Sequence, residues 1–256
     1  MKRIICKIIL AVLTLALLAS FACCSPAKEQ PTEKQVWLAT SYIHHKEDSK
    51  GTYTYNEYGN MISNENYNLY DVYQGTWLYE YDERQNQTKR SVDTGKEEPF
   101  VQLINIYDEN GRLIEEQQFW GGDGATYTYR YDKQGRVAAK LSDGKAVQVY
   151  IYAEDGSYRM ESASDPANYT LYDKDGRIME QHISGITGIY VYNEDGKLIE
   201  VKQSSDSDDK LLRHYLYELD EHGNNTRIYV VGSDGEKELH SEFTYELFTV
   251  KVLPES

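Results

Sequence analysis

The carboxylates are the first residues of this chain that could do chemistry, because some of them lie at spacings that resemble a calcium loop. The segments DKDG at 173–176 and DSDD at 206–209 have the closely spaced oxygen ligands with which such a loop begins. A calcium loop also needs a Glu at a fixed distance after its Gly, and Glu180 lies at the wrong distance from Gly176. A β-turn that recurs along the chain explains DKDG together with its relatives. The sequence therefore predicts no metal site.

Histidines and nucleophiles show no catalytic arrangement. The six His residues are scattered, and only His44 and His45 are adjacent. Adjacent residues on a strand point to opposite faces, so this pair cannot act on one ligand. The chain has no G-x-S-x-G motif. Its 42 acidic residues make any pair of glycosidase-like carboxylates easy to find and therefore uninformative. We expect a protein that is not an enzyme and needs no cofactor.

Aromatic side chains offer the sharpest binding chemistry. The chain has 24 Tyr and 3 Trp, with dense clusters at 73–81 and 120–131. Aromatic rows on an exposed sheet can stack against sugar rings, and a repeated module would supply many weak sites that act together. The same side chains could instead pack within the sheet or between its layers. Both interpretations stay open. The residues that would face a ligand are Trp77, Trp120, Tyr127, Tyr129 and Tyr131.

These side chains must be positioned by a repeat, which recurs from residue 52 onward. Strand-favouring residues around a Tyr are followed by Asp or Asn, two variable residues, Gly, a basic or polar residue and an apolar one. The anchor positions lie between 20 and 27 residues apart, a period typical of modular arrays. They are Tyr55, Tyr81, Tyr107, Tyr131, Tyr152, Tyr172, Tyr192 and Leu219.

The residues after each anchor predict a tight turn. Asp or Asn at the first position of a type I turn accepts backbone N–H bonds, and Gly at the fourth adopts the left-handed conformation. A type I turn followed by such a residue is a common β-hairpin connection. Three instances depart from the pattern, with Gln85 for Gly, Ala153 for Asp and Asn224 for Arg. The predicted turn residues are Asp108, Gly111, Asp132, Gly135, Asp173, Gly176, Asn193 and Gly196.

The fold predicted from this repeat is all-β, an antiparallel meander of β-hairpins that forms a twisted or curled sheet. Tyr residues two apart, such as Tyr129 and Tyr131, point to one face of a strand. Stacked hairpins would bring such pairs together as cross-strand aromatic contacts. No helical pattern follows the amino terminus, and the segment at 243–250 is expected to be a last strand.

The motif Y-D-x-x-G-R-[LIV] resembles the YD repeat of the RHS family, which occurs in bacterial surface and toxin-shell proteins and in animal teneurins. The resemblance covers roughly 52–225 and is strongest at Tyr107, Tyr131, Tyr172 and Tyr192. It implies long antiparallel hairpins wound into a sheet, sometimes as a large closed shell. This chain is far too short for such a shell, and only six residues follow Val250.

The amino terminus has the layout of a secretory signal. Basic residues precede an apolar run at 8–18, which is too short for a confident membrane span. A small residue followed by Cys resembles the bacterial lipoprotein signal, in which cleavage precedes a Cys that becomes lipidated. Ala22–Cys23 fits best, and Cys24 is the alternative. The expected organisation is a signal peptide at 1–22, a lipid-anchored flexible tether at 23–36 and a YD-repeat domain at 37–256.

Charge and cysteine content limit the partners. The formal net charge is −15, which disfavours nucleic acid and anionic lipid surfaces. All three Cys lie before residue 25, so the rest of the chain can form neither disulfides nor a Cys-ligated zinc site. We expect an extracytoplasmic lipoprotein, held on the cell membrane or outer membrane by its lipid, that binds protein or glycan at the cell envelope. The alternatives are a carbohydrate-binding or carbohydrate-active accessory protein and a toxin-associated or immunity lipoprotein.

Overall fold

The computed structural model describes residues 31–120 and 123–254, which form β-strands joined by turns and loops. Within these ranges there is no helix. The strands are β1 (Thr32–His44), β2 (Ser49–Tyr55), β3 (Met61–Asn68), β4 (Tyr73–Tyr81), β5 (Gln87–Asp93), β6 (Phe100–Tyr107), β7 (Leu113–Trp120), β8 (Asp123–Tyr131), β9 (Val137–Ser142), β10 (Lys145–Tyr152), β11 (Tyr158–Ser162), β12 (Tyr169–Tyr172), β13 (Ile178–Ile183), β14 (Ile186–Tyr192), β15 (Leu198–Ser205), β16 (Leu211–Leu219), β17 (Asn225–Val231) and β18 (Lys237–Val252).

The chain divides into two compact units. One comprises Met1–Glu33 and Val252–Ser256, and its described residues are 31–33 and 252–254, which include the start of β1 and the end of β18. The other, Lys34–Lys251, contains the rest of the sheet together with its turns and its hollows.

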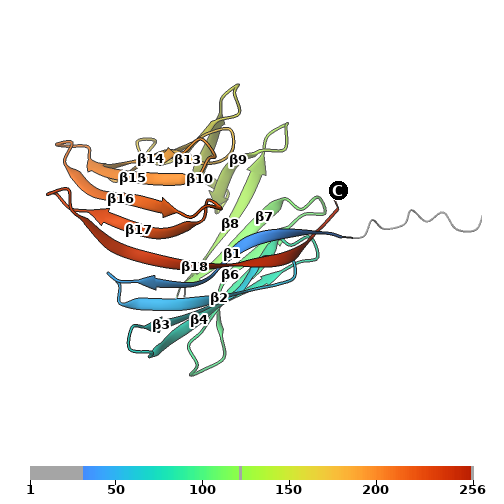
Figure 1. Cartoon of the computed structure of the whole chain (residues 1–256). Coiled ribbons are helices and arrows are strands. Elements are labelled where there is room, and N and C mark those ends of the chain that lie inside the picture. The colour runs from blue at the N-terminus through green and yellow to red at the C-terminus, as the bar shows by residue number, and fades with distance from the viewer. Residues whose placement is uncertain (1–30, 121–122, 255–256) are drawn as a thin grey trace, which may run out of the picture. The chain divides into compact units, whose positions relative to one another are not determined.

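Each strand pairs antiparallel with the next strand in sequence, and β1 also pairs with β18. Figure 1 shows these two strands side by side, β1 in blue and β18 in red. Thr40 Oγ1 on β1 donates to the Thr244 carbonyl on β18, and His44 further along β1 contacts Ser241, so residue numbers rise along β1 as they fall along β18. The described strands of Lys34–Lys251 therefore form a closed sheet without a free edge at which another chain could add a strand.

The predicted all-β antiparallel meander is confirmed, and the closure of the sheet is a finding that the repeat alone did not determine. Two boundaries differ from expectation. β1 begins at Thr32, so the residues up to Val36 that were assigned to the flexible tether are strand residues. β18 extends from Lys237 to Val252, well beyond the expected strand at 243–250, because it spans the sheet opposite both β17 and β1.

The two faces of the sheet differ in burial. On β8, for example, Tyr127, Tyr129 and Tyr131 are half-buried, whereas Thr128 and Arg130 between them are exposed. The same alternation recurs at Tyr55, Tyr81, Tyr107 and Tyr152, while Ile106 and Ile151 on the opposite face are exposed. We call the face that carries the anchor tyrosines the inner face. The buried centre is thin, and its few buried apolar residues are Tyr42, Ala139, Val201 and Val250.

Candidate functional site

Eight turns lie at one end of the closed sheet, because each joins an even-numbered strand to the next odd-numbered one. We call them the YD turns. In the turn at Asp108, the N–H of Gly111 donates to the Asp108 carbonyl, and the N–H of Asp108 donates to the Arg112 carbonyl. Asp108 Oδ1 also accepts the N–H groups of Asn110 and Arg112, both at 2.9 Å. Gly111 has φ +78°, which places it in the left-handed region.

Where the motif has Arg, at Arg112, Arg136 and Arg177, this residue links its turn to the next repeat. Arg112 Nε donates to Asp108 Oδ2 at 2.7 Å, and its guanidinium lies 5.1 Å from the ring centre of Tyr131. The same arrangement recurs where Arg136 pairs with Asp132 and stacks on Tyr152. The backbone N–H of Arg112, followed by its guanidinium and the N–H of Asn110, keeps the pKa of Asp108 below its usual value against opposing desolvation.

Six of the seven anchor tyrosines, together with Tyr245 on β18, connect neighbouring strands through their hydroxyl groups. Tyr107 on β6 donates to the carbonyl of Gln87, the first residue of β5, at 3.0 Å. The equivalent bonds join Tyr55 to Ala39, Tyr81 to Met61, Tyr131 to Leu113, Tyr152 to Val137, Tyr192 to Ile178 and Tyr245 to Asn225. Burial raises the pKa of these tyrosines, which stay neutral donors near neutral pH. Ring contacts between tyrosines were expected from the sequence, whereas this ladder of hydroxyl bonds was not.

Departures from the motif keep the turn geometry by other means. Gln85 adopts φ +66° in place of Gly, and its side-chain carbonyl accepts the amides of Asn56 and Asn60 in the neighbouring turn. Where Ala153 replaces Asp, Asp155 Oδ1 accepts the Ser157 N–H instead.

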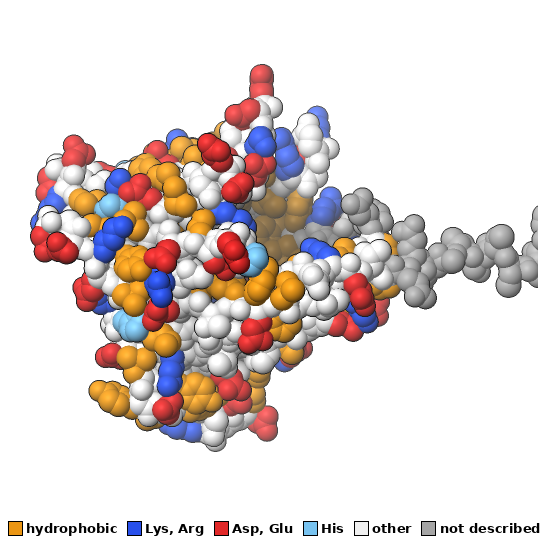
Figure 2. All heavy atoms as spheres, viewed as in Figure 1, with side chains coloured by type: hydrophobic (Ala, Val, Ile, Leu, Met, Phe, Trp, Pro, Cys, Tyr) orange, Lys and Arg blue, Asp and Glu red, His pale blue; other side chains and the backbone are white. Residues whose placement is uncertain are grey.

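The opposite end of the sheet varies from one connection to the next. Asp143-Gly144 and Ser184-Gly185 form two-residue turns in which both residues have positive φ. The connection at 94–99 is longer and fully exposed. The inner face close to this end contains hollows lined by mixed apolar and polar side chains. Figure 2 shows the apolar lining of a hollow in the face in view, with acidic and basic side chains interspersed around it.

One hollow of about 580 Å³ is lined by two Trp and two Phe residues. Trp77 on β4 lies opposite Val92 on β5, and Val92 lies opposite Phe100 on β6, so their side chains share one face. Trp120 ends β7 and is 72% exposed, and Phe100 is 46% exposed. We call this hollow the aromatic site, and it is lined by Trp77, Arg90, Phe100, Gln102, Gln118, Phe119 and Trp120.

Arg90 is the one charged residue of this lining among the described residues. It lies beside Tyr79 across β4 and β5, and its guanidinium carbon is 5.1 Å from the ring centre of Trp77. Its Nε is buried and has no hydrogen-bond partner in the described part of the chain. A buried donor without a partner costs stability unless a ligand or water supplies an acceptor.

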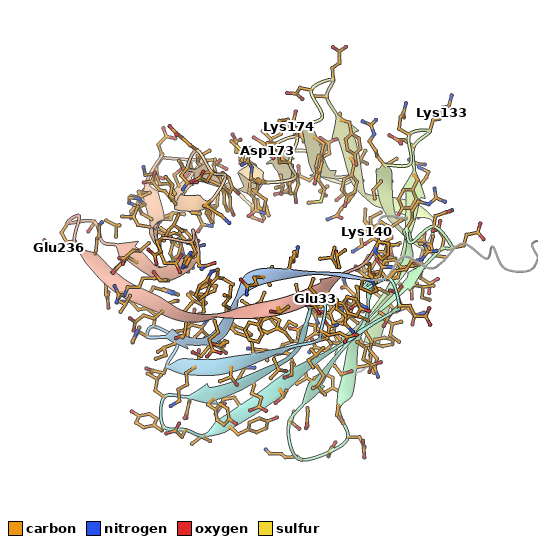
Figure 3. The ribbon with its side chains drawn as sticks, turned by 45° about the vertical axis from the view of Figure 1, so that its right-hand side comes forward. Glu33, Lys133, Lys140, Asp173, Lys174 and Glu236 are labelled. Carbon is orange, nitrogen blue, oxygen red and sulfur yellow. The ribbon has the colours of Figure 1, made fainter. Side chains whose placement is uncertain are left out.

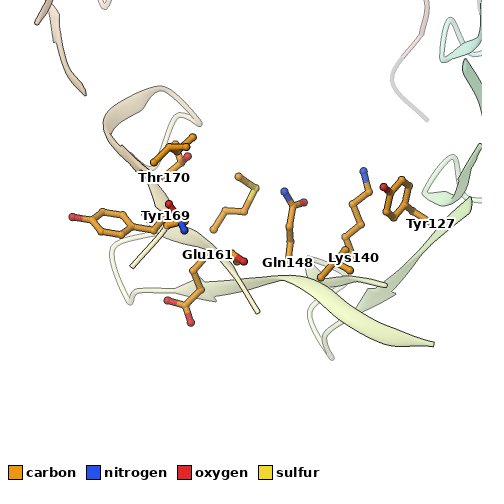
Figure 4. Close-up of a pocket in the computed structure, with 11 residues that line it drawn as sticks. Tyr127, Lys140, Gln148, Glu161, Tyr169 and Thr170 are labelled. Atoms are coloured by element: carbon orange, nitrogen blue, oxygen red, sulfur yellow. The ribbon is translucent and has the colours of Figure 1, made fainter. Parts of the chain in front are cut away.

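A second hollow, of about 370 Å³, lies around Lys140 on β9 (Figure 4). Lys140 and Gln148 rise on the same side of their strands, and Lys140 reaches toward Tyr127. Lys140 Nζ lies 4.2 Å from the ring centre of Tyr127 and donates to Glu116 Oε1 at 2.7 Å. Figure 3 shows Lys140 pointing inward, whereas Lys133 and Lys174 in the YD turns point away from the sheet.

The two hollows are joined by a short chain of hydrogen bonds along β7. Gln118, which lines the aromatic site, donates its amide to Glu116 Oε1 at 2.6 Å. The same oxygen accepts the Lys140 ammonium, and Tyr129 donates to the other carboxylate oxygen at 3.2 Å. Burial, followed by the charge of Glu116, raises the pKa of Tyr129 far above its usual value. Glu116 thus neutralises the lysine and fixes the glutamine.

The structure divides the five aromatic residues that were expected to face a ligand. Trp77 and Trp120 meet in the aromatic site, and Tyr127 lines the hollow at Lys140. Tyr129 contacts Glu116, and Tyr131 belongs to the hydroxyl ladder at the YD turns. Sequence reasoning missed Arg90, Phe100, Gln102, Gln118 and Phe119. Residues two apart on a strand share a face, so the spacing from Trp120 could have identified Gln118. The bulge between Arg90 and Ser91 cannot be read from the sequence, and it hides which residues of β5 and β6 lie opposite one another.

Histidines scattered in sequence meet where β1 and β18 pair. Ser241 is 1% exposed, and its hydroxyl lies 2.7 Å from His44 Nδ1 and 2.6 Å from His240 Nδ1. A bulge opposite Ile228 and Tyr229 turns His240 and Ser241 toward the same side. Burial lowers the pKa of His44, and the neighbouring His240 acts in the same direction. Because the hydroxyl is buried, it cannot reach a substrate, and the cluster joins the two terminal strands.

Metal ligands and membrane-spanning helices are absent from the described part of the chain. Over 31–120 and 123–254, no group of three His, Cys, Asp or Glu side chains is arranged to hold a metal ion. In the same ranges, no helix has the length and hydropathy to cross a membrane. The predicted lipidation residues, Cys23 and Cys24, lie outside the described residues.

Comparison with known proteins identifies the repeat in part of the chain. Residues 107–147, which include the turns at Asp108 and Asp132, match the family model described as RHS Repeat. No curated protein matches the chain.

Several solved structures are similar to this chain at low identity. A structure of TcdB2-TccC3-Cdc42 is 13% identical over 72% of this chain, with a TM-score of 0.32. The Tc holotoxin pore of Photorhabdus luminescens is 12% identical over 71% of this chain, with a TM-score of 0.31. The chain covers 14% of the length of each of these. A porin-like protein from Bacteroides uniformis is 13% identical over 86% of this chain and 99% of its own, with a TM-score of 0.44.

Proposed function

We propose that this protein is a lipid-anchored, non-enzymatic binding protein of the bacterial cell envelope, and that it binds glycan at the aromatic site. The observation that carries the proposal is the aromatic site itself. Two Trp and two Phe line it together with one guanidinium and two amides, in a hollow large enough for one or more sugar rings.

The chemistry of this lining suits a sugar. Aromatic faces bury the C–H surfaces of a sugar ring, while Arg and Gln side chains supply directional hydrogen bonds to its hydroxyl groups. The exposed rings of Trp120 and Phe100 leave the hollow open to a ligand from outside the sheet. Trp77 is half-buried and held by Arg90, so it would form a preorganised platform.

The repeat accounts for the scaffold under this proposal. Each hairpin has too little apolar surface to fold alone, and the closed array supplies the mutual support. The hydroxyl ladder and the YD turns hold the strands at one end. The aromatic site at the other end therefore sits on a fixed frame, as a binding site requires.

A glycan array with the full-length chain in detergent tests the binding proposal. We expect specific capture of one class of cell-wall or host glycan. Trp77→Ala and Trp120→Ala should each weaken binding about tenfold or more, because a sugar stacked on an aromatic ring loses most of its apolar contact when the ring is removed. Trp37→Ala is the matched control, because Trp37 stacks on His222 and does not line the aromatic site. Capture that survives all three changes, or no capture at all, would contradict the proposal.

Labelling with a radioactive fatty acid in a bacterial host tests the anchor. We expect incorporation into the wild type and into Cys24→Ser, and no incorporation into Cys23→Ser. Labelling that depends on Cys24 alone would move the cleavage site by one residue. Equal labelling of both variants, or none of the wild type, would remove the lipid anchor from the proposal.

A further inference from the structure

We propose that the ligand of the aromatic site carries a carboxylate on its sugar ring and that Arg90 binds this carboxylate. The inference rests on the proposed function, because it specifies the class of glycan that the same site takes. Three features of the inner face support it: the charge of the lining, the state of the Arg90 guanidinium and the contrast with Lys140.

The aromatic site has the opposite charge to the protein as a whole. The chain has 42 Asp and Glu against 27 Lys and Arg, yet the described lining of this hollow contains no carboxylate and one guanidinium. A neutral sugar would need no such exclusion of acidic residues. An anionic sugar favours it, because a carboxylate in the lining would repel the carboxylate of the ligand at close range.

Arg90 is oriented and yet unpaired. Its guanidinium carbon lies 5.1 Å from the ring centre of Trp77, and this packing holds the group beside the hollow. The buried Nε has no acceptor among the described residues. A guanidinium edge presents parallel N–H donors that match the two oxygens of a carboxylate, and such charge-assisted bonds are stronger than bonds to a hydroxyl. A carboxylate would satisfy Arg90 better than a neutral sugar could.

Lys140, which lines the neighbouring hollow, is already neutralised. Its ammonium donates to Glu116 at 2.7 Å, and both side chains are 15% exposed. Gln118 lines the aromatic site and donates its amide to Glu116. The side chain that lies between the aromatic site and the Glu116–Lys140 pair is therefore a neutral amide. Of the two cations that line these hollows in the described chain, Arg90 is therefore the one whose positive charge is free to bind a ligand.

The experiment compares acidic oligosaccharides with their own methyl esters. Calorimetry with the full-length chain would use trimers of galacturonate, glucuronate and mannuronate, the methyl ester of each trimer, and neutral trimers of the parent sugars. Esterification removes the charge and keeps the ring and its stereochemistry. We expect at least one acidic trimer to bind about tenfold or more tightly than its ester, in line with a charge-assisted bond.

Two variants assign this difference to Arg90. Arg90→Gln should reduce the affinity for the acid to that for the ester, with little effect on the ester. Arg130→Gln makes the same change of charge at an exposed position on the outer face of β8 and should leave both affinities unchanged. The preference for the acid should also weaken as salt is raised, because a part-exposed ion pair is screened.

The outcomes separate this inference from the proposed function. If acids, esters and neutral trimers bind equally and all binding is lost in Trp77→Ala, the inference that the ligand carries a carboxylate is wrong, whereas the proposal that the aromatic site binds glycan stands. A preference for acids that persists in Arg90→Gln would overturn the role of Arg90. Failure of every trimer to bind, together with an empty glycan array, would overturn both proposals.

Discussion

The two ends of the closed sheet are built on different principles. At the YD end, eight turns repeat one set of hydrogen bonds, and each anchor Tyr or Arg contacts the neighbouring strand or repeat. At the other end, the connections differ in length and conformation, and the hollows on the inner face differ in lining. Repetition at one end fixes the frame, so variation at the other end can change a binding site without loss of the fold.

The largest contrast should come from insertions. A Gly-Ser pair inserted between Glu109 and Asn110 breaks the closing bonds of a YD turn and the contact of Arg112 with Tyr131. We expect a loss of about 2 kcal/mol or more in the free energy of unfolding, since several hydrogen bonds disappear together. The same insertion between Glu97 and Glu98 should cost about 0.5 kcal/mol or less. Urea unfolding at neutral pH measures both, and equal costs would remove the distinction between the ends.

A smaller effect should follow from removal of one hydroxyl of the ladder. Tyr107→Phe deletes the bond to the Gln87 carbonyl and should lower the free energy of unfolding by about 1 kcal/mol. Tyr172→Phe is the control, because Tyr172 stacks on Tyr158 at 4.5 Å and its hydroxyl has no bond within the described residues. Tyr172→Phe should be nearly neutral. A Tyr107→Phe variant that is equally neutral would show that the ladder adds nothing beyond ring packing.

The two ends should also respond to different ranges of pH. His44 has a pKa below its ordinary value of 6.5, so its contribution to stability is complete above pH 6.5 and is lost as the pH falls below it. Its neighbours Glu47, His45 and His240 share this environment. His44→Gln should therefore show a smaller loss of stability than the wild type between about pH 7.5 and about pH 5.5, by chemical unfolding at each pH.

Asp108 at the YD end should act only in stronger acid. Its pKa lies below 3.8, so its contribution is present above that pH and is lost as the pH falls through the folded value. Asp108→Asn should differ from the wild type by a constant amount between about pH 5 and about pH 8, and the difference should shrink only below about pH 4. A pH dependence of the difference near neutrality would contradict this assignment.

The smallest effect is expected where the repeat departs from its own pattern. Gln85→Gly relieves the positive φ but removes the acceptor for the amides of Asn56 and Asn60. The relief and the lost hydrogen bonds are each worth about 1 kcal/mol, so the net change should be within about 0.5 kcal/mol of zero. Thermal unfolding of this variant decides whether the side chain compensates for the missing Gly. A gain of about 1 kcal/mol or more would mean that it does not.

The sequence alone determined the turns and the all-β class of the fold. A type I turn with a left-handed fourth residue depends on a few consecutive residues, so local sequence is enough to place Asp108 with Gly111 and Asp132 with Gly135. The all-β class followed from the same local signals and from the alternation of tyrosines. The hydroxyl bonds of those tyrosines could not be predicted, because each acceptor is a backbone carbonyl on another strand.

Only the tertiary structure decided that the sheet closes and where its binding chemistry lies. Closure depends on twist accumulated over all the strands, and no local motif specifies it. The meeting of Trp77 with Phe100 and Trp120 depends on the register of four strands, which the bulge at Arg90 shifts. The same holds for His44 and Ser241, which lie at opposite ends of the sequence and meet because β1 pairs with β18. Consecutive residues are therefore enough to determine the YD turns, whereas the pairing of several strands determines which residues line the aromatic site.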